Sequence, residues 1–294
     1  MILVTGAAGK TGRAVIRAVV GRGAVVRALV HRPEQAAAVR ALGAQEVVTG
    51  DMRRAGIMDQ ATGGVQAVYH ICPNVHPDEV AIGQAAIEAA RRARVGHFVF
   101  HSVLHPQVEA MPHHWLKMRV EEELLASGLA YTILQPAAYM QNVLAQRESV
   151  VQRGIYAVPY AVDTRLGMVD LADVAEVAAI VLAEPGHEGA TYELCGPEIL
   201  TQVEVANLMG RQLGQAVRAQ AVPREAWQEQ ARDGGLSRYQ VETLLKMFVY
   251  YEQHGFGGNP NVLGCLLGRR PTGFAGFLER VVAEWQGRSG PGQG

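Results

Sequence analysis

The sequence predicts an α/β protein built on a doubly wound parallel sheet, with a smaller, helix-rich region in its second half. Short apolar segments alternate with helical segments through the first half, as in βαβ units. The apolar segments carry few polar residues, as expected of strands covered by helices on both faces. In chain order they are ILVT, AVVRALV, EVVT, QAVYHI, HFVFHS and AYTILQ.

The segments between these predicted strands have helical patterns. The clearest are Arg13–Val20, Pro33–Leu42 and Glu79–Arg94. A helix between successive strands is the connection that parallel pairing requires, because the chain must cross back over the sheet. The alternation therefore predicts a parallel sheet with helices on both faces.

The second half has more helix signals. Asp170 precedes an apolar stripe as a capping residue would, and Thr201 and Ser237 each begin a capping box, with Glu204 and Gln240 three residues later. Two further stripes have helical spacing, and we interpret them as core: Val241, Leu244, Leu245, Phe248 and Val249, then Phe274, Phe277, Leu278, Val281, Val282 and Trp285.

Composition excludes several classes of protein. Of 294 residues, 49% are hydrophobic and 19% are charged, which is typical of a globular chain, and the net charge of −1 argues against nucleic acid or an anionic membrane as a partner. No apolar run is long enough to span a bilayer and no signal peptide is visible, so we expect a cytoplasmic protein. The three cysteines, Cys72, Cys195 and Cys265, suggest incidental thiols.

The stretch GAAGKTG, Gly6 to Gly12, indicates which phosphate the chain binds. A P-loop requires a glycine at position 4, where the sequence has Val4. The spacing Gly6-x-x-Gly9-x-x-Gly12 between a strand and a helix instead fits a dinucleotide-binding turn, in which the helix start faces a pyrophosphate. We therefore predict a Rossmann sheet whose cofactor contacts in this turn include Ala8, Lys10 and Thr11.

The end of the next strand favours NADP(H) over NAD(H). An acidic residue about 20 positions past the glycines usually binds the ribose 2′-OH of NAD. Here that position is Arg32, preceded by His31. A guanidinium suits a 2′-phosphate because it binds bidentately. The alternative is that Arg32 is a solvated loop residue.

We expect residues 1–153 to form the NADP(H)-binding Rossmann domain. Residues 154–288 are expected to form mainly a C-terminal substrate or capping region, with some elements returning to the Rossmann sheet. Residues 289–294 have the composition of a disordered tail.

These residues resemble the NmrA-like branch of the atypical short-chain dehydrogenases/reductases over nearly the whole chain. The resemblance rests on the glycine turn, Gly50-Asp51, Lys117-x-x-x-Glu121, the stretch Ser127–Pro136 and Val169–Ala175. The family contains NADP(H)-dependent quinone and dye reductases as well as regulators that sense NADP.

The resemblance implies further cofactor positions. Asp51 and Met52 are expected near the adenine, and Ile71, Cys72 and Pro73 near the ribose and nicotinamide. Ser102 is expected near the substrate, and the segment Pro136, Ala138 and Tyr139 beside the carboxamide.

The catalytic pattern departs from that of typical short-chain dehydrogenases, which carry Tyr-x-x-x-Lys on one helix. Lys117 has His113 four residues earlier instead of a tyrosine. The catalytic candidates are Lys117, His113 as a proton donor, and Tyr139. The alternatives are a solvated lysine paired with Glu121 and a histidine in the mobile mouth of a pocket. Lys117 is also expected to hold the cofactor ribose.

Five histidines cluster in sequence, namely His97, His101, His105, His113 and His114. Their spacing does not place them on one face and no cysteine or carboxylate completes a set, so we predict no metal site.

The sequence therefore favours an NADP(H)-dependent oxidoreductase that transfers hydride to a small apolar acceptor such as a quinone, enone or dye. The alternative is a non-catalytic NADP(H)-binding redox sensor that acts through a protein partner. A sugar-nucleotide epimerase is disfavoured by the missing tyrosine. We expect a monomer or homodimer.

Overall fold

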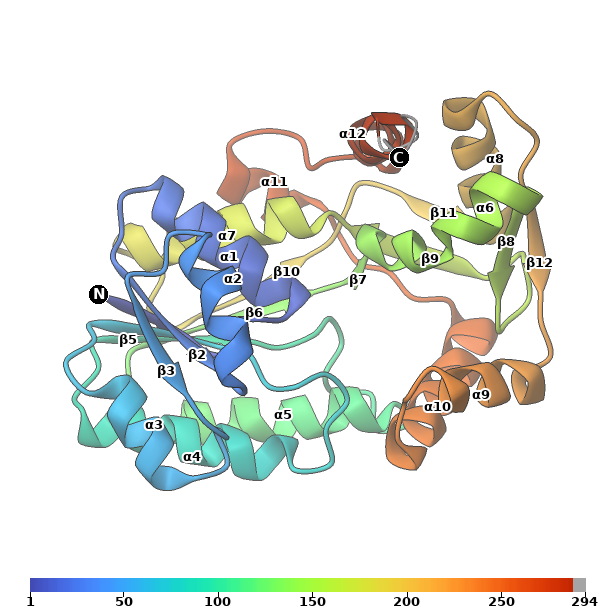
Figure 1. Ribbon diagram of the computed structural model, residues 1–294. Coiled ribbons are helices and arrows are strands. Elements are labelled where there is room, and N and C mark those ends of the chain that lie inside the picture. The colour runs from blue at the N-terminus through green and yellow to red at the C-terminus, as the bar shows by residue number, and fades with distance from the viewer. Residues whose placement is uncertain (288–294) are drawn as a thin grey trace.

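The chain forms a central sheet covered by helices, with a smaller lobe packed against one end (Figure 1). The computed structural model describes residues 1–287, so the predicted disordered tail at 289–294 lies outside the described residues. The seven strands of the central sheet run in the order β10-β6-β5-β4-β1-β2-β3, and each neighbouring pair is parallel. The predicted fold class is confirmed.

The predicted strands are present, with ends that move by at most two residues. Their bounds are β1 Ile2–Val4, β2 Val26–Val30, β3 Glu46–Thr49, β4 Ala67–His70, β5 His97–His101 and β6 Tyr131–Pro136. The seventh strand, β10 (Ala190–Leu194), is not identified by the sequence analysis. It is an edge strand and only half buried, so its sequence ATYEL keeps polar residues that the central strands lack.

The two faces of the sheet pack into separate cores because side chains alternate along each strand. Ile2 and Val4 face the core beneath α1 (Lys10–Gly21) and α7 (Leu171–Ala183), whereas Leu3 faces the opposite core. That opposite core lies under α3 (Ala55–Thr62), α4 (Glu79–Arg92) and α5 (Pro112–Leu125). Burial of each such aliphatic side chain stabilises the fold by about 1.5–3 kcal/mol.

Two helices on one face approach closely at a glycine. A Cβ built on Gly83 of α4 would lie 2.6 Å from Val120 Cγ1 of α5. The small residue thus lets α4 and α5 pack side by side, and this fixes the position of α5 over the edge of the sheet where the site lies.

The smaller lobe contains a three-stranded sheet, a two-stranded sheet and a core of its own. Its strands are β7 (Ala138–Tyr139), β8 (Ile155–Val158), β9 (Arg165–Val169), β11 (Ile199–Thr201) and β12 (Arg218–Ala221). Its helical elements are η2 (Met140–Gln146), α6 (Arg147–Arg153), α8 (Gln202–Leu213), α9 (Arg224–Asp233) and α10 (Arg238–His254).

The predicted helix caps of the second half are present. The side chain of Asp170 caps α7, and Thr201 and Ser237 form capping boxes at α8 and α10. The remaining helices are η1 (Pro33–Gln35), α2 (Ala36–Arg40), α11 (Asn261–Leu267) and α12 (Phe274–Gly287), and the side chain of Trp285 in α12 lies outside the described ones.

The chain returns to the sheet after entering the smaller lobe. Both α7 and β10 follow residue 153, yet α7 packs on α1 and β10 pairs with β6. The division at residue 153 stays a prediction. Within residues 1–287, no helix combines the length and the apolar character that crossing a bilayer requires.

Candidate functional site

The glycine turn lies at the point where the strand order reverses, between β1 and its two neighbours β2 and β4. Gly6 has φ = +56°, which glycine adopts without strain. A Cβ on Gly12 would lie 2.5 Å from the carbonyl oxygen of Gly6 and 2.7 Å from Ala7 Cα, so only glycine fits there. Gly9 precedes α1 without a side-chain cap, which leaves the first N–H groups of the helix available to an anion.

A cavity of about 530 Å³ extends from this turn along the carboxyl ends of the strands. Most of the residues predicted from sequence line it. They are Gly6, Ala8, Gly9, Lys10, Thr11, Gly12, Met52, Ile71, Cys72, Pro73, Ser102, His113, Lys117, Pro136, Ala138 and Tyr139. This is the position at which open α/β sheets bind ligands, because the loops that follow the strands leave a crevice there.

Two predicted cofactor residues do not line the cavity. The side chain of Arg32 is 64% exposed and lies 3.5 Å from Glu34, although its neighbours His31 and Gln35 do line the cavity. The carboxylate of Asp51 binds the Arg53 guanidinium, and this interaction lowers the pKa of Asp51 to about 2. Arg32 is thus at the rim of the cavity, paired with Glu34 and largely exposed.

Lys117 is buried and paired, but with a residue that the sequence analysis does not single out. Its Nζ donates to Glu79 Oε1 at 2.8 Å and to the carbonyl oxygen of His101 at 3.2 Å. Glu79 is fully buried at the start of α4. The alternative of a solvated lysine paired with Glu121 is therefore wrong, because α5 presents Lys117 to α4 and β5. The Glu79 charge offsets the Lys117 charge.

Glu121 instead belongs to a separate buried cluster. Ser102 donates to its carboxylate, and the Gln135 amide donates to both carboxylate oxygens, at 3.0 and 2.9 Å. Burial raises the pKa of Glu121 despite these bonds. Ser102 therefore lines the cavity while its hydroxyl group is directed to Glu121.

His113 and His114, at the start of α5, are buried beside the cavity. Burial and the nearby Lys117 charge hold the pKa of His113 well below its usual value, and burial lowers that of His114 to about 4. Among residues 1–287, His113 Nδ1 has no hydrogen-bond partner. A neutral His113 can hydrogen-bond to a ligand, whereas an imidazolium form is disfavoured here.

Tyr139 lies at the end of a chain of hydrogen bonds. Tyr69 Oη is 2.6 Å from His101 Nδ1, and His101 Nε2 is 2.5 Å from Tyr139 Oη. Thr11 donates to Tyr139 Oη at 3.4 Å, and Lys10 Nζ lies 5.5 Å from the Tyr139 ring. His101 lines the cavity as the last residue of β5, so its position at a strand end is the signal that could have identified it.

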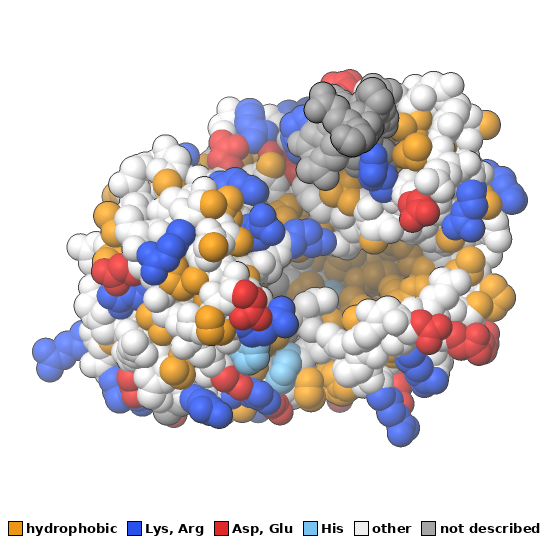
Figure 2. Space-filling model, in the orientation of Figure 1, with side chains coloured by type: hydrophobic (Ala, Val, Ile, Leu, Met, Phe, Trp, Pro, Cys, Tyr) orange, Lys and Arg blue, Asp and Glu red, His pale blue; other side chains and the backbone are white. Residues whose placement is uncertain are grey.

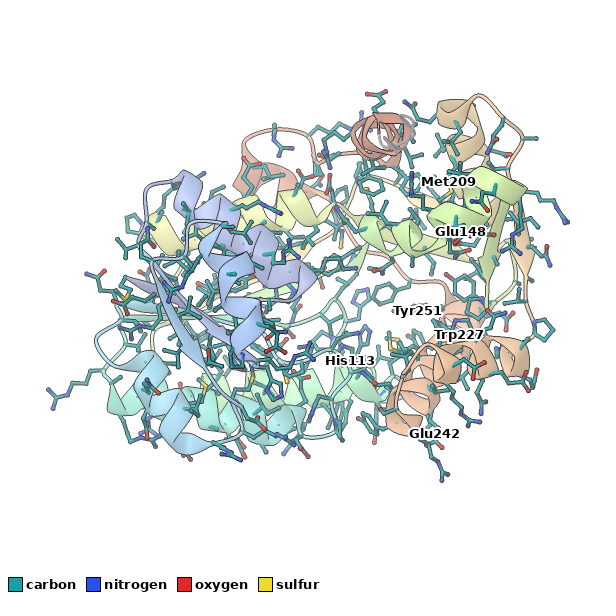
Figure 3. The ribbon with its side chains drawn as sticks, in the orientation of Figure 1. His113, Glu148, Met209, Trp227, Glu242 and Tyr251 are labelled. Atoms are coloured by element: carbon teal, nitrogen blue, oxygen red, sulfur yellow. The ribbon has the colours of Figure 1, made fainter. Side chains whose placement is uncertain are left out.

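The other end of the cavity is apolar. It is lined by Leu244, Met247, Tyr251 and Phe256, the first three from α10. Figure 2 shows the molecule hollowed between the two lobes, with hydrophobic side chains at the floor of the hollow. Figure 3 places His113 on α5 and Tyr251 on α10, on the two sides of this space. The stripe on α10 is thus only partly core, because Leu244 faces the cavity.

The five histidines that cluster in the sequence do not form one group in the fold, although His101, His113 and His114 line the same cavity. Among the residues that the structure describes, no group of three or more His, Cys, Asp or Glu could hold a metal ion. His97 bonds to Thr132, and His105 bonds to the carbonyl oxygen of Gly257.

Comparison with known proteins defines the class of this fold and site. Residues 1–282 match the profile of the NmrA-like family. The chain belongs to the NmrA-like family, as its resemblance implies.

Three relatives are informative. The chain is 29% identical over 285 residues to NAD(P)H azoreductase of Xenophilus azovorans, covering 96% of this chain and 98% of that protein. It is 33% identical over 266 residues to (4-alkanoyl-5-oxo-2,5-dihydrofuran-3-yl)methyl phosphate reductase of Streptomyces griseus, covering 90% of each. NADPH-dependent quinone oxidoreductase QOR2 from Escherichia coli, solved with NADPH, superposes with a TM-score of 0.83 at 26% identity, covering 96% of this chain and 100% of that chain.

Proposed function

We propose that the protein is an NADP(H)-dependent reductase that transfers hydride to a small, largely apolar acceptor such as a quinone, enone or dye. The observation that carries the proposal is a single cavity with two different ends. One end is a glycine turn at a helix start, which suits a pyrophosphate, and the other end is apolar and lined in part by α10. The reductase activities of the relatives named above support it.

The glycine turn fits the cofactor. Gly12 lets the start of α1 pack directly against the backbone of Gly6 and Ala7, and Gly9 leaves the first N–H groups of the helix without a side-chain cap beside the cavity. When bound, the reduced nicotinamide supplies a hydride to the acceptor. Arg32, at the rim, would bind the 2′-phosphate that distinguishes NADPH from NADH.

Lys117 and Glu79 act by holding the site together. Their buried ion pair joins α5 to α4, and Lys117 also binds the last carbonyl group of β5. We propose that this pair fixes the position of His101 and of the α5 segment that carries His113. Because the Glu79 carboxylate offsets the Lys117 charge, the pair contributes little net charge to a product anion, and we propose that the proton comes from another group.

Cofactor preference tests the nucleotide end. NADPH and NADH are titrated into the wild type and into Arg32→Ala, with binding followed by cofactor fluorescence. Charge-assisted hydrogen bonds contribute about 1.5–3 kcal/mol, so the variant should lose about 10- to 100-fold of its preference for NADPH. Arg40→Ala, an exposed arginine on α2, is the matched control. Equal preference in Arg32→Ala and wild type would show that Arg32 is only a loop residue.

The second candidate is a redox sensor that binds NADP(H) without consuming it. It is favoured by the histidine at position 113 and by the pairing of Lys117 with Glu79. Turnover with a panel of quinones separates the two candidates, because a sensor would bind NADPH and leave it unoxidised. For the reductase we propose a cytoplasmic setting and a monomer or homodimer.

A further inference from the structure

The direction of hydrogen bonding along Tyr69, His101 and Tyr139 follows from burial. Tyr69 is fully buried, and among residues 1–287 its hydroxyl oxygen has one hydrogen-bond partner, His101 Nδ1. If Nδ1 carried the proton, the Tyr69 hydroxyl would accept and its own hydrogen would be buried without an acceptor. That cost disfavours the arrangement by roughly tenfold or more. Tyr69 therefore donates to Nδ1.

The tautomer of His101 is then fixed. With Nδ1 as the acceptor, a neutral imidazole carries its proton on Nε2, which donates to Tyr139 Oη. Burial and the Lys117 charge lower the pKa of His101 to about 3, so the ring stays neutral. Thr11 also donates to Tyr139 Oη. Because His101 and Thr11 both donate to the Tyr139 oxygen, the hydroxyl hydrogen of Tyr139 points to neither of them and is available to a third group.

We propose that Tyr139 is the proton donor to the reduced acceptor, and that Tyr69 and His101 are positioning residues that orient its O–H group into the cavity. This inference rests on the proposed function. Tyr139 lines the cavity and is half buried, in hydrogen-bond contact with Thr11 of α1 and with His101 at the end of β5.

The step balances for a quinone. The acceptor gains a hydride, with its two electrons, from the nicotinamide. The Tyr139 O–H bond breaks and an O–H bond forms on the acceptor oxygen, which gives a neutral quinol. Burial raises the pKa of Tyr139, so the transfer is driven by the basicity of the anion that hydride transfer creates on the acceptor. The Tyr139 phenolate that remains accepts hydrogen bonds from His101 Nε2 and Thr11, near the Lys10 ammonium group, and regains a proton from solvent. His101 keeps its proton throughout.

The first test needs no cofactor. Imidazole ¹⁵N shifts of the cofactor-free protein, with the His101 signal assigned by its loss in His101→Asn, report the tautomer. We expect Nε2–H in wild type and a shift toward Nδ1–H in Tyr69→Phe. An Nδ1–H tautomer in wild type would overturn the proposal. Tyr156→Phe, which removes a buried hydroxyl group outside the cavity, is the control.

The second test compares acceptors that differ in their need for a proton. A neutral quinone requires one after hydride transfer, whereas a cationic triarylmethyl dye gives a neutral product without one. In Tyr69→Phe and Tyr139→Phe, the ratio of quinone to dye turnover should fall about 10- to 100-fold, consistent with loss of a general acid. Tyr156→Phe should keep the wild-type ratio.

The outcomes separate the two proposals. If wild type binds NADPH but reduces neither acceptor, the proposed function fails. If wild type reduces the quinone and the variants keep the wild-type ratio, or if it reduces only the cationic dye, the assignment of Tyr139 is overturned. In a series of quinones, the loss of turnover in Tyr69→Phe and Tyr139→Phe should become smaller as substituents make the product anion less basic. A loss of turnover that is the same for every quinone would contradict the proposal.

Discussion

The two ends of the cavity are built in different ways. The nucleotide end consists mostly of backbone from one short segment, Gly6 to Gly12, whose form depends on the absence of side chains. The acceptor end consists of side chains from β5, α5 and α10, which are far apart in the sequence. The nucleotide end thus has no room for a Cβ at Gly6 or Gly12, whereas the acceptor end depends on the shapes and charges of side chains.

The largest expected effect is at the acceptor end. Lys117→Met should leave Glu79 buried without its partner, and loss of one member of a buried ion pair costs about 3–5 kcal/mol. Urea denaturation measures this loss. Glu79→Gln/Lys117→Met should recover part of it, and Lys246→Met, at an exposed lysine on α10, should change little. If Lys117→Met unfolded at the same urea concentration as the wild type, the Lys117–Glu79 pair would not be needed for stability.

Adding a single methyl group at Gly12 should greatly weaken NADPH binding at the nucleotide end. In Gly12→Ala the new Cβ meets backbone atoms, which cannot move aside as a side chain can. Overpacking costs up to about 3 kcal/mol, so NADPH affinity should fall by about 100-fold. Gly21→Ala, on the same helix with nothing within 4 Å of the added Cβ, is the control and should bind normally. Normal NADPH binding by Gly12→Ala would refute the assignment of the turn.

Acid should lower the free energy of unfolding, through buried histidines at the acceptor end. Burial lowers the pKa of His101 to about 3 and that of His114 to about 4, so below pH 6.5 the unfolded chain binds more protons than the folded chain. Stability therefore falls as pH drops from about 6.5 toward 4, by up to about 1.4 kcal/mol per pH unit for each histidine.

Urea midpoints measured between pH 7.5 and pH 5 check this slope. His114→Gln should flatten it, because one of the buried rings with a lowered pKa is removed. The same slope in His114→Gln and wild type would mean that other groups control acid sensitivity.

The smallest expected effect is on acceptor binding. Leu244→Ala removes apolar contact from the cavity wall supplied by α10, which should lower kcat/KM for a quinone by about tenfold, or about 1.4 kcal/mol. NADPH affinity should stay unchanged, because Leu244 belongs to the apolar wall supplied by α10 and not to the glycine turn. Leu125→Ala, at a leucine that is 54% exposed on α5, is the control. If Leu244→Ala lowered NADPH affinity as much as kcat/KM for the quinone, the two ends of the cavity would not be functionally separate.

The site is predictable from sequence where local pattern determines it. Most of the glycine turn, the residues that follow β4 and the last residue of β5 line the cavity, because the carboxyl ends of parallel strands meet at the same edge of a sheet. The partner of Lys117 could not be predicted in this way. Glu121 is one helical turn away in sequence, but Glu79 is nearer in space because α4 packs against α5.

The sequence by itself determined six of the seven strands of the central sheet, the glycine turn and the helix caps, because each has a local pattern of residues that are close together in the chain. Only the tertiary structure decided which charges meet, that Leu244 faces a cavity, and that Tyr69, His101 and Tyr139 share one chain of hydrogen bonds. Such contacts depend on how helices and strands pack across the sheet, and packing joins residues whose separation in sequence carries no local signal.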